Sequence, residues 1–562
     1  MSHSNNTAKT LDGPAATQLD WIADAQDANA QEHDLKFFDA LKLYRKSVLW
    51  ALLMSTAIFM EGYDTMLMGN MFGFPEFRKR YGQPAKGDTY QIPAPWQAGL
   101  TNGSACGQLV GLLVSGYMTE RFGFRKTMTL GLTASAAFIF IPFFAPSLAV
   151  LEVGQVLFGE LIETVFNMTL SNNSNSGIFM GLYQTIPVVY AKEISPVCLQ
   201  AYLTTWVNTC WAIGHLIGAG ILRALLVRGD EWGYRIPFAI HTCRLTHGRW
   251  VWPLILVPSL YFAPESPWWL VRRGRLEEAK KVLKRLTSTE HAHFDIDKAV
   301  SFMVVTTNFE KAISAETSYL ACFKGTDLKR TLIAIGVYCI QTLSGNPLRS
   351  YSTYFMEQAG FPTTQASDMT IVNYSLALVG GLVSWPLLTL FGRRSIYVWS
   401  LFLMLVLMIL IGGIGIPQAN SSDHSYSWAI AALLIVSSFL YNATMGPLTN
   451  AICSEVPSTL LCSKTVVLAR WFYTITSITA GVLTPYQLNP TAWNWGAKTG
   501  FFWAGGCLIS FIFAYFCVPE TKDRTAAEVD ILFNRKASLR CFSKTSVDLV
   551  EAVVGANGKE RN

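Results

Sequence analysis

Apolar and polar stretches alternate along this chain in blocks of about 20 residues. Such a block is long enough, as a helix, to cross the roughly 30 Å hydrocarbon core of a bilayer. After a polar start, the apolar runs lie at 47–69, 95–118, 127–145, 148–190 (interrupted), 199–222, 236–263, 331–356, 369–390, 395–416, 427–452, 464–487 and 499–518. The pattern therefore predicts about twelve membrane spans.

One long hydrophilic segment, 264–330, divides these runs into six and six. We therefore predict an all-α polytopic membrane protein with twelve transmembrane helices in two six-helix bundles. Its expected parts are a tail at 1–46, a bundle at 47–263, linker helices at 264–330, a bundle at 331–518 and a tail at 519–562. An even number of spans puts both tails and the basic linker on one side, and the positive-inside rule makes that side cytoplasmic. The polar segment from Arg78 to Pro95 would then be an extracellular loop, whose Arg78, Lys79 and Arg80 are an exception to the rule.

Composition agrees with a membrane protein and excludes several other classes. Hydrophobic residues make up 51% of the chain and charged residues 15%, so a soluble protein is excluded. The net charge of +6 is small and comes from loops beside the runs, so no nucleic-acid partner is expected. The 11 cysteines lack metal-ligand spacing, and the chain contains no phosphate loop and no nucleophile with a positioned base. We expect no metal, no cofactor and no enzymatic activity.

Charged motifs recur at corresponding places in the two predicted bundles. The segment 116–126 corresponds to 389–394, the segment 190–196 to 454–457, and the segment 264–275 to 519–522. These matches indicate a duplicated six-span unit, as in secondary transporters. Their charged residues at span ends are Glu120, Arg121, Arg125, Glu193, Glu265, Arg393, Arg394, Glu455 and Glu520. We interpret them as a cytoplasmic gate whose ion pairs form and part during transport; the alternative is that they only anchor helix ends at the interface.

Two carboxylates lie within the first apolar run. Glu61 and Asp64 are three residues apart, so in a helix they share one face and can both point into the protein. An acid inside a membrane span indicates a functional site, because it must be paired, protonated or in contact with water. The alternative is that the acids lie near a helix end and reach for the headgroups.

Together these motifs closely resemble the sugar porter family of the major facilitator superfamily, from about residue 47 to 533. The resemblance rests on Gly-Tyr-Asp at 62–64, Glu-Arg-x-Gly-x-Arg-Lys at 120–126, Pro-Glu-Ser-Pro at 264–267, Gln-x-x-Ser-Gly at 341–345, Gly-Arg-Arg at 392–394 and Pro-Glu-Thr-Lys at 519–522. Within the family, the segments 202–208, 234–239 and 263–272 look like those of fungal maltose and α-glucoside permeases.

The resemblance implies a set of sugar-contacting positions and some departures from the hexose pattern. By position, the substrate-binding residues would be Asn208, Gln341, Thr342, Asn450 and Trp471, with Arg470 beside them. Thr342 replaces a usual Gln, Pro347 an Asn, Asn450 a Trp and Arg470 an Asn. The loss of the Trp enlarges the expected cavity, which favours a disaccharide over a hexose.

Proton coupling is expected to centre on Asp64. Proton-linked members of the family carry an Arg in span four as the partner of this acid, whereas this chain has Gln155 there. The nearest cation within a span is Arg470. We therefore predict that Asp64, sharing its proton with Glu61, is the protonation site and that Arg470 keeps it ionised in one conformation and releases it in the other. A static ion pair of Asp64 with Arg470 is the alternative.

Two segments depart from the family pattern. Residues 160–180 interrupt span four with a polar Asn/Ser run, which we interpret as an insertion, and residues 241–249 are a smaller excess before span six. Either could be translated intron or a genuine loop.

The predicted function is proton-coupled uptake of a maltose-like α-glucoside across a fungal plasma membrane by alternating access. The expected partners are a small sugar, protons and the lipid bilayer. The alternatives are a hexose, other sugar or polyol facilitator of the same family, and a sensor that binds sugar without transporting it.

Overall fold

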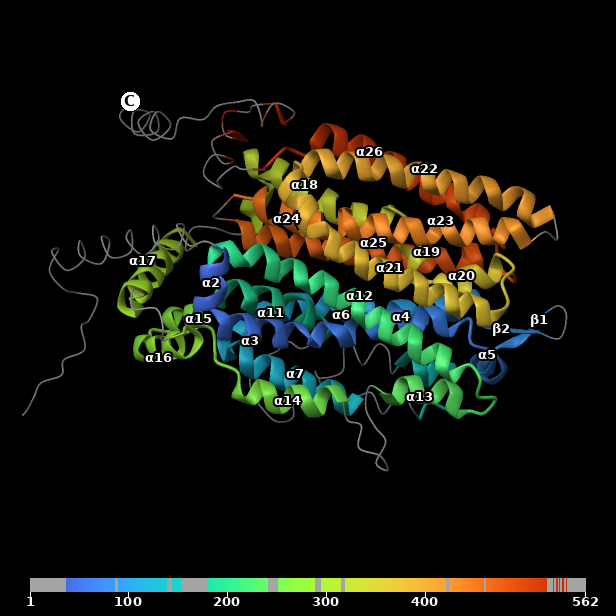
Figure 1. The fold of residues 1–562 in the computed structure, drawn as a ribbon, viewed down its shortest axis with the longest axis horizontal. Coiled ribbons are helices and arrows are strands. Elements are labelled where there is room, and N and C mark those ends of the chain that lie inside the picture. The colour runs from blue at the N-terminus through green and yellow to red at the C-terminus, as the bar shows by residue number, and fades with distance from the viewer. Residues whose placement is uncertain are drawn as a thin grey trace, which may run out of the picture.

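The computed structural model describes residues 37–85, 89–138, 144–153, 179–240, 251–288, 295–314, 319–420, 424–458 and 461–522, together with single residues between 529 and 542. Long helices run side by side in two halves, the first blue to green and the second yellow to red (Figure 1). Short linker helices lie at one end of the bundle and a two-stranded hairpin at the other. We call these the linker end and the hairpin end.

The first half is built from helices that follow the predicted apolar runs. Its elements are α2 (Phe37–Leu43), α3 (Arg45–Ser55), α4 (Ala57–Met71), α5 (Pro75–Tyr81), β1 (Gln83–Ala85), β2 (Thr89–Gln91), α6 (Ala94–Phe122), α7 (Phe124–Phe138), α11 (Phe179–Ile194), α12 (Val197–Leu225), α13 (Trp232–Ile240) and α14 (Val251–Phe262). The predicted insertion lies outside the described residues up to Phe179, where α11 begins, and the segment 241–249 lies outside them entirely. Residues 1–36 also lie outside the described residues.

The polar segment after the first span is more ordered than the sequence suggested. It contains most of α5 and the antiparallel pair β1–β2, in which Gln83 is opposite Gln91. The polar connection from Arg78 to Pro95 thus contains short regular elements that were not predicted. Strands of three residues are too short to show an alternating pattern, so the sequence could not indicate them.

The linker and the second half complete the chain. The linker contains α15 (Pro267–Arg272), α16 (Leu276–Leu286), α17 (Ile296–Ser314) and the 3₁₀ helix η1 (Tyr319–Phe323). The second half contains α18 (Gly325–Leu343), α19 (Asn346–Ser350), α20 (Ser352–Gln358), α21 (Thr363–Leu390), α22 (Arg393–Asn420), α23 (His424–Ala443), α24 (Met445–Glu455), α25 (Cys462–Leu488), η2 (Gly496–Lys498) and α26 (Thr499–Cys517).

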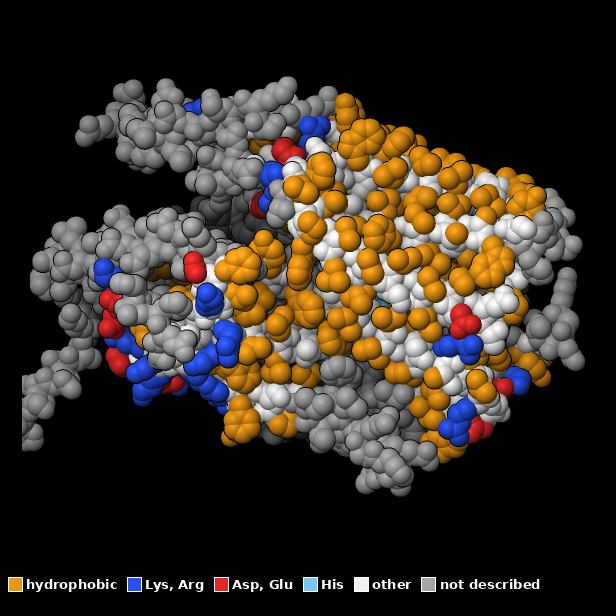
Figure 2. Space-filling model, in the orientation of Figure 1, with side chains coloured by type: hydrophobic (Ala, Val, Ile, Leu, Met, Phe, Trp, Pro, Cys, Tyr) orange, Lys and Arg blue, Asp and Glu red, His pale blue; other side chains and the backbone are white. Residues whose placement is uncertain are grey.

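Length and composition identify membrane-spanning candidates within the described part of the chain. Five segments, all in the second half, are long and apolar enough: Thr363–Leu388, Arg393–Gln418, Ser425–Cys453, Lys464–Leu488 and Gly496–Cys517. On the face drawn in Figure 2, apolar side chains cover most of the described middle part, whereas Lys, Arg, Asp and Glu gather toward the two ends. This distribution is that of a helix bundle surrounded by lipid.

The first apolar run forms α3 and α4, and α4 is buried on nearly all sides. A Cβ on Gly62 would lie only 2.6 Å from the backbone oxygen of Trp211, so glycine allows α4 and α12 to pack closely. Glu61 is 2% exposed and Asp64 8%. The prediction that both carboxylates face the protein is confirmed.

The seventh apolar run, predicted as one span, is broken. Gly345 has a φ of +82°, which ends the α-helical path of α18, and Pro347 lies in the first turn of α19. The chain then resumes as α20 after Tyr351. The break is buried, with Ser344 fully shielded from solvent and Arg349 4% exposed.

The buried apolar residues show that the two halves are joined at one end. One continuous core contains first-half residues from the hairpin end, such as Met71 and Phe77, together with most of the second half. A separate core at the linker end, including Met128 and Leu256, contains only residues of the first half and of the linker. The halves therefore share apolar packing at the hairpin end.

Candidate functional site

A cluster of polar side chains lies where the two halves face each other. The Gln108 amide on α6 donates a hydrogen bond to Oε1 of Glu61 on α4 at 3.1 Å. From the second half, the guanidinium of Arg470 on α25 interacts electrostatically with Glu61. The cluster thus joins an acid of the first half to a cation of the second.

Second-half tyrosines and an asparagine surround this cation. The Arg470 guanidinium lies 5.5 Å from the centre of the Tyr338 ring on α18, and the Tyr338 hydroxyl donates to Oδ1 of Asn450 on α24 at 3.0 Å. Tyr473 on α25 interacts electrostatically with both Arg470 and Glu61. Because α6 packs against α25, the two helices bring Gln108 and Arg470 together across the interface. Such a group of donors, acceptors and aromatic faces suits a hydroxyl-rich ligand and a mobile proton.

The charge of Arg470 interacts with the other acid of α4 than the one selected from the sequence. The sequence led us to place Arg470 beside Asp64, and the electrostatic interaction that the structure gives is with Glu61, so the pairing with Asp64 stays a prediction. Asp64, three residues further along α4, interacts electrostatically with the adjacent Tyr63. Gln155, at the position where proton-linked members of the family carry an arginine, lies outside the described residues.

The predicted sugar-contacting residues are distributed over both halves. Asn208 on α12 lies next to Gly446 of α24, so it is at the interface between the halves. Gln341 and Thr342 are in the last turn of α18, and the hydroxyl of Thr342 is buried without a hydrogen-bond partner in the described structure. Trp471 is on α25, edge-on to Phe472. Asn450 is the member of this set that joins the polar cluster directly.

Gln108, Tyr338 and Tyr473 were not found from the sequence. They are neutral side chains in apolar runs and belong to none of the motifs. An amide or hydroxyl in a span joins helices more often than it binds a ligand, so its identity alone gave no reason to select it.

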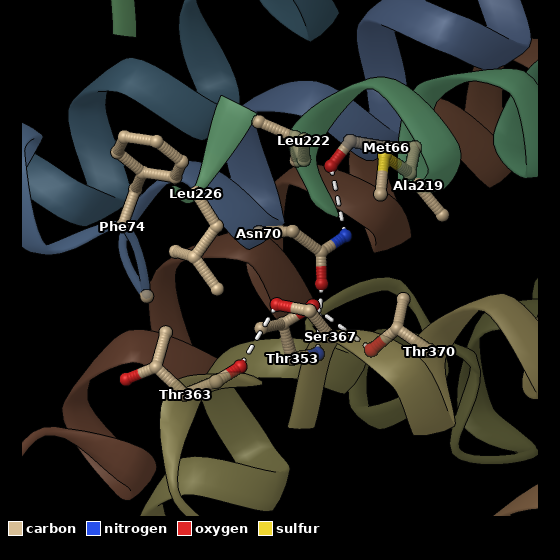
Figure 3. A pocket seen from close by; sticks show the side chains of 11 residues that line it. Met66, Asn70, Phe74, Ala219, Leu222, Leu226, Thr353, Thr363, Ser367 and Thr370 are labelled. Atoms are coloured by element: carbon tan, nitrogen blue, oxygen red, sulfur yellow. Dashed lines mark hydrogen bonds between the residues drawn. The ribbon is translucent and has the colours of Figure 1, made fainter. Parts of the chain in front are cut away.

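At the hairpin end, Asn70 joins the halves through its side chain. Its amide nitrogen donates to the backbone oxygens of Met66 and Ser350, and its amide oxygen accepts from the backbone N–H of Thr353. Asn70, Met66 and Thr353 line a small pocket between α4 and α12 of one half and α20 and α21 of the other (Figure 3). The pocket is about 13 Å along α4 from Glu61, at about 1.5 Å per residue. The satisfied amide makes this part of the interface specific as well as close.

Two ion pairs also join the halves at the hairpin end. Arg78 on α5 pairs with Glu357 on α20, and its Nε donates to the backbone oxygen of Phe72 at 2.5 Å. Arg223 on α12 pairs with Asp368 on α21 at 2.5 Å. The first pair is largely buried and the second is exposed. Arg78, one of the three basic residues that are an exception to the positive-inside rule, thus has a specific partner in the other half.

At the linker end, the charged motifs of the first half are satisfied within that half and the start of the linker. Glu265 accepts from the backbone N–H groups of Phe124, at 2.9 Å, and Arg125, at 3.3 Å. Glu193 pairs with Arg272 at 2.5 Å and accepts from the hydroxyl of Ser266. The Ser266 hydroxyl also caps α15 by accepting from the N–H of Trp269, ahead of Pro267 in its first turn.

The second half repeats these contacts with its own motifs. Glu520 accepts from the backbone N–H of Arg393 at 2.7 Å, as Glu265 does from Phe124. Glu455 accepts from the hydroxyl of Thr521 at 2.5 Å and pairs with Arg393 at 3.5 Å. The duplication predicted from the motif pairs is therefore visible as matching hydrogen bonds.

The remaining motif residues lie at the same end of the bundle. Arg121 lies over Phe122, Arg125 over Tyr261, and Arg394 donates to the backbone oxygen of Tyr515 at 2.8 Å. The side chain of Glu120 is outside the described part of the structure. Each contact given for these motifs joins one half to itself or to the segment that follows it, and none joins the two halves, so the role of the set as a gate stays a prediction.

Glu265 offers a direct test of how the first-half motif works. Burial raises the pKa of its carboxyl group, and the backbone N–H groups of Ser266, Arg125 and Phe124 oppose that shift. Replacing Glu265 by Ala leaves N–H groups at the start of α7 without an acceptor. We expect a loss of about 2 kcal/mol in the free energy of unfolding.

The measurement is thermal unfolding of the purified protein in detergent. Glu265→Gln keeps one acceptor oxygen and is the matched control, expected to retain most of the stability. Equal stability of the Ala variant and the parent would contradict this role.

Comparison with known proteins agrees with this fold. Two solved structures of the xylose transporter XylE from E. coli match with a TM-score of 0.65. One, a partially occluded inward-open conformation, is 16% identical and covers 86% of this chain and 99% of that one. The other, the proton:xylose symporter bound to 6-bromo-6-deoxy-D-glucose, is 18% identical and covers 87% and 99%. The fold is that of the major facilitator superfamily.

Sequence relatives define the family more closely. The family model described as sugar (and other) transporter matches residues 50–533, so the chain belongs to this family. The general alpha-glucoside permease of Saccharomyces cerevisiae is 36% identical over 530 residues, covering 93% of this chain and 81% of the permease. The maltose permease MAL31 of the same yeast is 37% identical over 542 residues, covering 95% and 83%.

Proposed function

We propose that this chain carries a maltose-like α-glucoside, together with a proton, across a membrane by alternating access. The similar yeast proteins are permeases of α-glucosides or of maltose, and XylE, which has the same fold, is a proton:xylose symporter. Because the chain is in a transporter family, an enzymatic activity is not proposed.

The observation that carries the proposal is the electrostatic interaction of Glu61 with Arg470 across the interface between the halves. A buried acid and cation on separate rigid bodies attract each other in one conformation and separate in another. When they separate, the acid gains affinity for a proton. Such a pair couples a change of protonation to the movement that exposes the site.

The proposed binding site surrounds this pair. Asn450, Gln341, Thr342, Asn208 and Trp471 supply the hydroxyl-matching and aromatic contacts that a sugar requires. Glu61 and Asp64 hold the proton, and Arg470 sets which of their forms is favoured. Asp64 lies less than one helical turn from Glu61, so the two acids titrate as a coupled pair.

The contacts between the halves suggest which side the site faces. The halves share a core and two ion pairs at the hairpin end, whereas the linker-end contacts given for the motifs are internal to each half. We propose that the linker end is the cytoplasmic side of a plasma membrane, with both tails on that side. The conformation then faces the cytoplasm, and the charged motifs at the linker end pair across the halves when the site faces outward.

The test is uptake of labelled maltose and labelled glucose into cells that lack their own sugar transporters, with the external pH followed. Maltose uptake with external alkalinisation supports the proposal. The chain is expressed as written and with residues 160–180 deleted, because the predicted insertion lies in span four. No uptake of maltose by either form overturns the substrate assignment and favours a sensor or another sugar.

Replacing Asp64 by Asn is expected to abolish the accumulation of maltose against its gradient. The amide cannot release a proton, so the cycle loses its driving ion while the sugar contacts remain. Downhill exchange of labelled for unlabelled maltose is expected to persist. Concentrative uptake by Asp64→Asn at the rate of the parent would contradict a proton-carrying role.

A further inference from the structure

The break in the seventh span holds a buried cation that the proposed mechanism does not use. Arg349 lies in α19, between α18 and α20, and is 4% exposed. Among the ion pairs of the described residues, none includes Arg349. A cation inside a membrane protein without a carboxylate partner is costly and calls for a specific compensation.

That compensation comes from the end of α18 and from an aromatic ring. The two terminal nitrogens of Arg349 donate to the backbone oxygen of Ser344, at 3.2 Å, and to its hydroxyl, at 3.4 Å. Ser344 is the C-terminal cap of α18, where the helix dipole favours a positive charge. The guanidinium also lies 4.4 Å from the centre of the Tyr441 ring on α23.

The neighbours of this guanidinium connect the candidate site with the contacts at the hairpin end. On one side, α18 carries Tyr338 and Gln341 of the candidate site. On the other, α20 carries Thr353 and Glu357, whose partners Asn70 and Arg78 belong to the first half. The Tyr441 ring itself lies beside Gly446, which is also next to Asn208. Arg349 therefore lies between the proposed sugar-contacting residues and the hairpin end.

We propose that Arg349 is a positioning residue that fixes the angle between α18 and α20 and so couples occupancy of the site to closure of the hairpin end. This inference rests on the proposed function for the identity of the ligand. The planar guanidinium bonds the end of α18 and stacks on Tyr441 at the same time, which holds the break in one geometry. Lysine keeps the charge but cannot make both contacts, and methionine keeps only the volume.

The chain supplies a matched control in Arg330. This residue is also on α18, is 2% exposed, and lies 4.4 Å from the centre of the Phe533 ring. It is near the linker end, far along the helix from the break. Replacing Arg330 by Met therefore removes a similar buried stack without changing the angle at Ser344.

Two readouts separate positioning from general stability. The first is the dissociation constant for maltose of the purified full-length protein. The second is the distance between spin labels attached at Val227→Cys and Gln365→Cys, in a background without other cysteines. These two exposed positions report the spacing of the halves at the hairpin end.

For Arg349→Met we expect a dissociation constant raised about tenfold, as for the loss of one charge-assisted hydrogen bond, and a longer label distance. Arg330→Met is expected to change neither. Arg349→Lys should lie between the parent and the Met variant, and it decides the question if the Met variant does not fold. Folded Arg349 variants with the parental affinity and label distance overturn the proposal.

The label distance also separates this inference from the proposed function, because it needs no sugar. If the parent does not bind maltose, the substrate assignment fails. An increased distance in Arg349→Met then still supports the positioning role, and an unchanged distance overturns it.

Discussion

Replacing Arg470 by Leu is expected to lower the rate of maltose uptake about 100-fold. Removal of one partner from a buried charge pair leaves the other charge uncompensated, at a cost of about 3 kcal/mol. In this chain the remaining charge is Glu61, whose hydrogen bond from Gln108 at 3.1 Å replaces only part of the lost interaction. Labelled-maltose uptake at matched expression measures the effect.

The paired substitution distinguishes a charge effect from a packing effect. In Glu61→Gln/Arg470→Leu both charges are absent, so binding of maltose is expected to recover at least about tenfold over Arg470→Leu, while accumulation against a gradient does not. Arg470→Lys retains a positive charge and is expected to keep part of the uptake. Equal loss of binding in Arg470→Leu and the double variant would show that the contact with Tyr338, and not the charge, is what matters.

The first span illustrates how far the sequence determined the site. The spacing of Glu61 and Asp64 was sufficient to predict that both acids face the protein, because the helical repeat fixes their shared face. It was not sufficient to choose the partner of Arg470. That choice depends on the rotation of α25 relative to α4, which is decided by packing between helices about 400 residues apart in the chain.

The motifs at span ends allowed more detailed predictions. Their recurrence indicated a duplicated unit, and the structure shows Glu265 and Glu520 accepting from backbone N–H groups at equivalent places. The sequence could not show that these acids bond to the backbone of their own half, because a backbone donor leaves no signature in the side-chain pattern. The break in the seventh span was also missed, although Gly345 and Pro347 are the residue types that end a helix.

Closure of the hairpin end depends on contacts that the sequence analysis did not select. Arg78 attracted attention only as an exception to the charge rule, and Glu357 belongs to no motif. The pair is nevertheless largely shielded from water, with side-chain exposures of 15% and 7%, and Arg78 also lies 5.5 Å from the Tyr354 ring centre. The shared apolar core alone would allow the halves to slide, whereas these polar contacts specify one relative position.

Replacing Glu357 by Gln is expected to shift the conformational equilibrium toward an open hairpin end by about 2 kcal/mol, or about 30-fold in the ratio of the two states. The spin-label distance between Val227→Cys and Gln365→Cys measures this ratio directly. Asp368→Asn breaks the exposed pair with Arg223 at the same end and is the matched control. Because water screens that pair, we expect a change below about 1 kcal/mol.

The combination of Arg78→Gln with Glu357→Gln shows whether the buried pair acts as a unit. If it does, the double variant opens the hairpin end no more than Glu357→Gln does, because Glu357→Gln alone already removes the attraction between the two side chains. An additive effect would assign the closure to the separate contacts of Arg78 with Phe72 and Tyr354. An unchanged distance in Glu357→Gln would show that the closed hairpin end is stabilised by the hydrogen bonds of Asn70 and by the apolar core, and not by this ion pair.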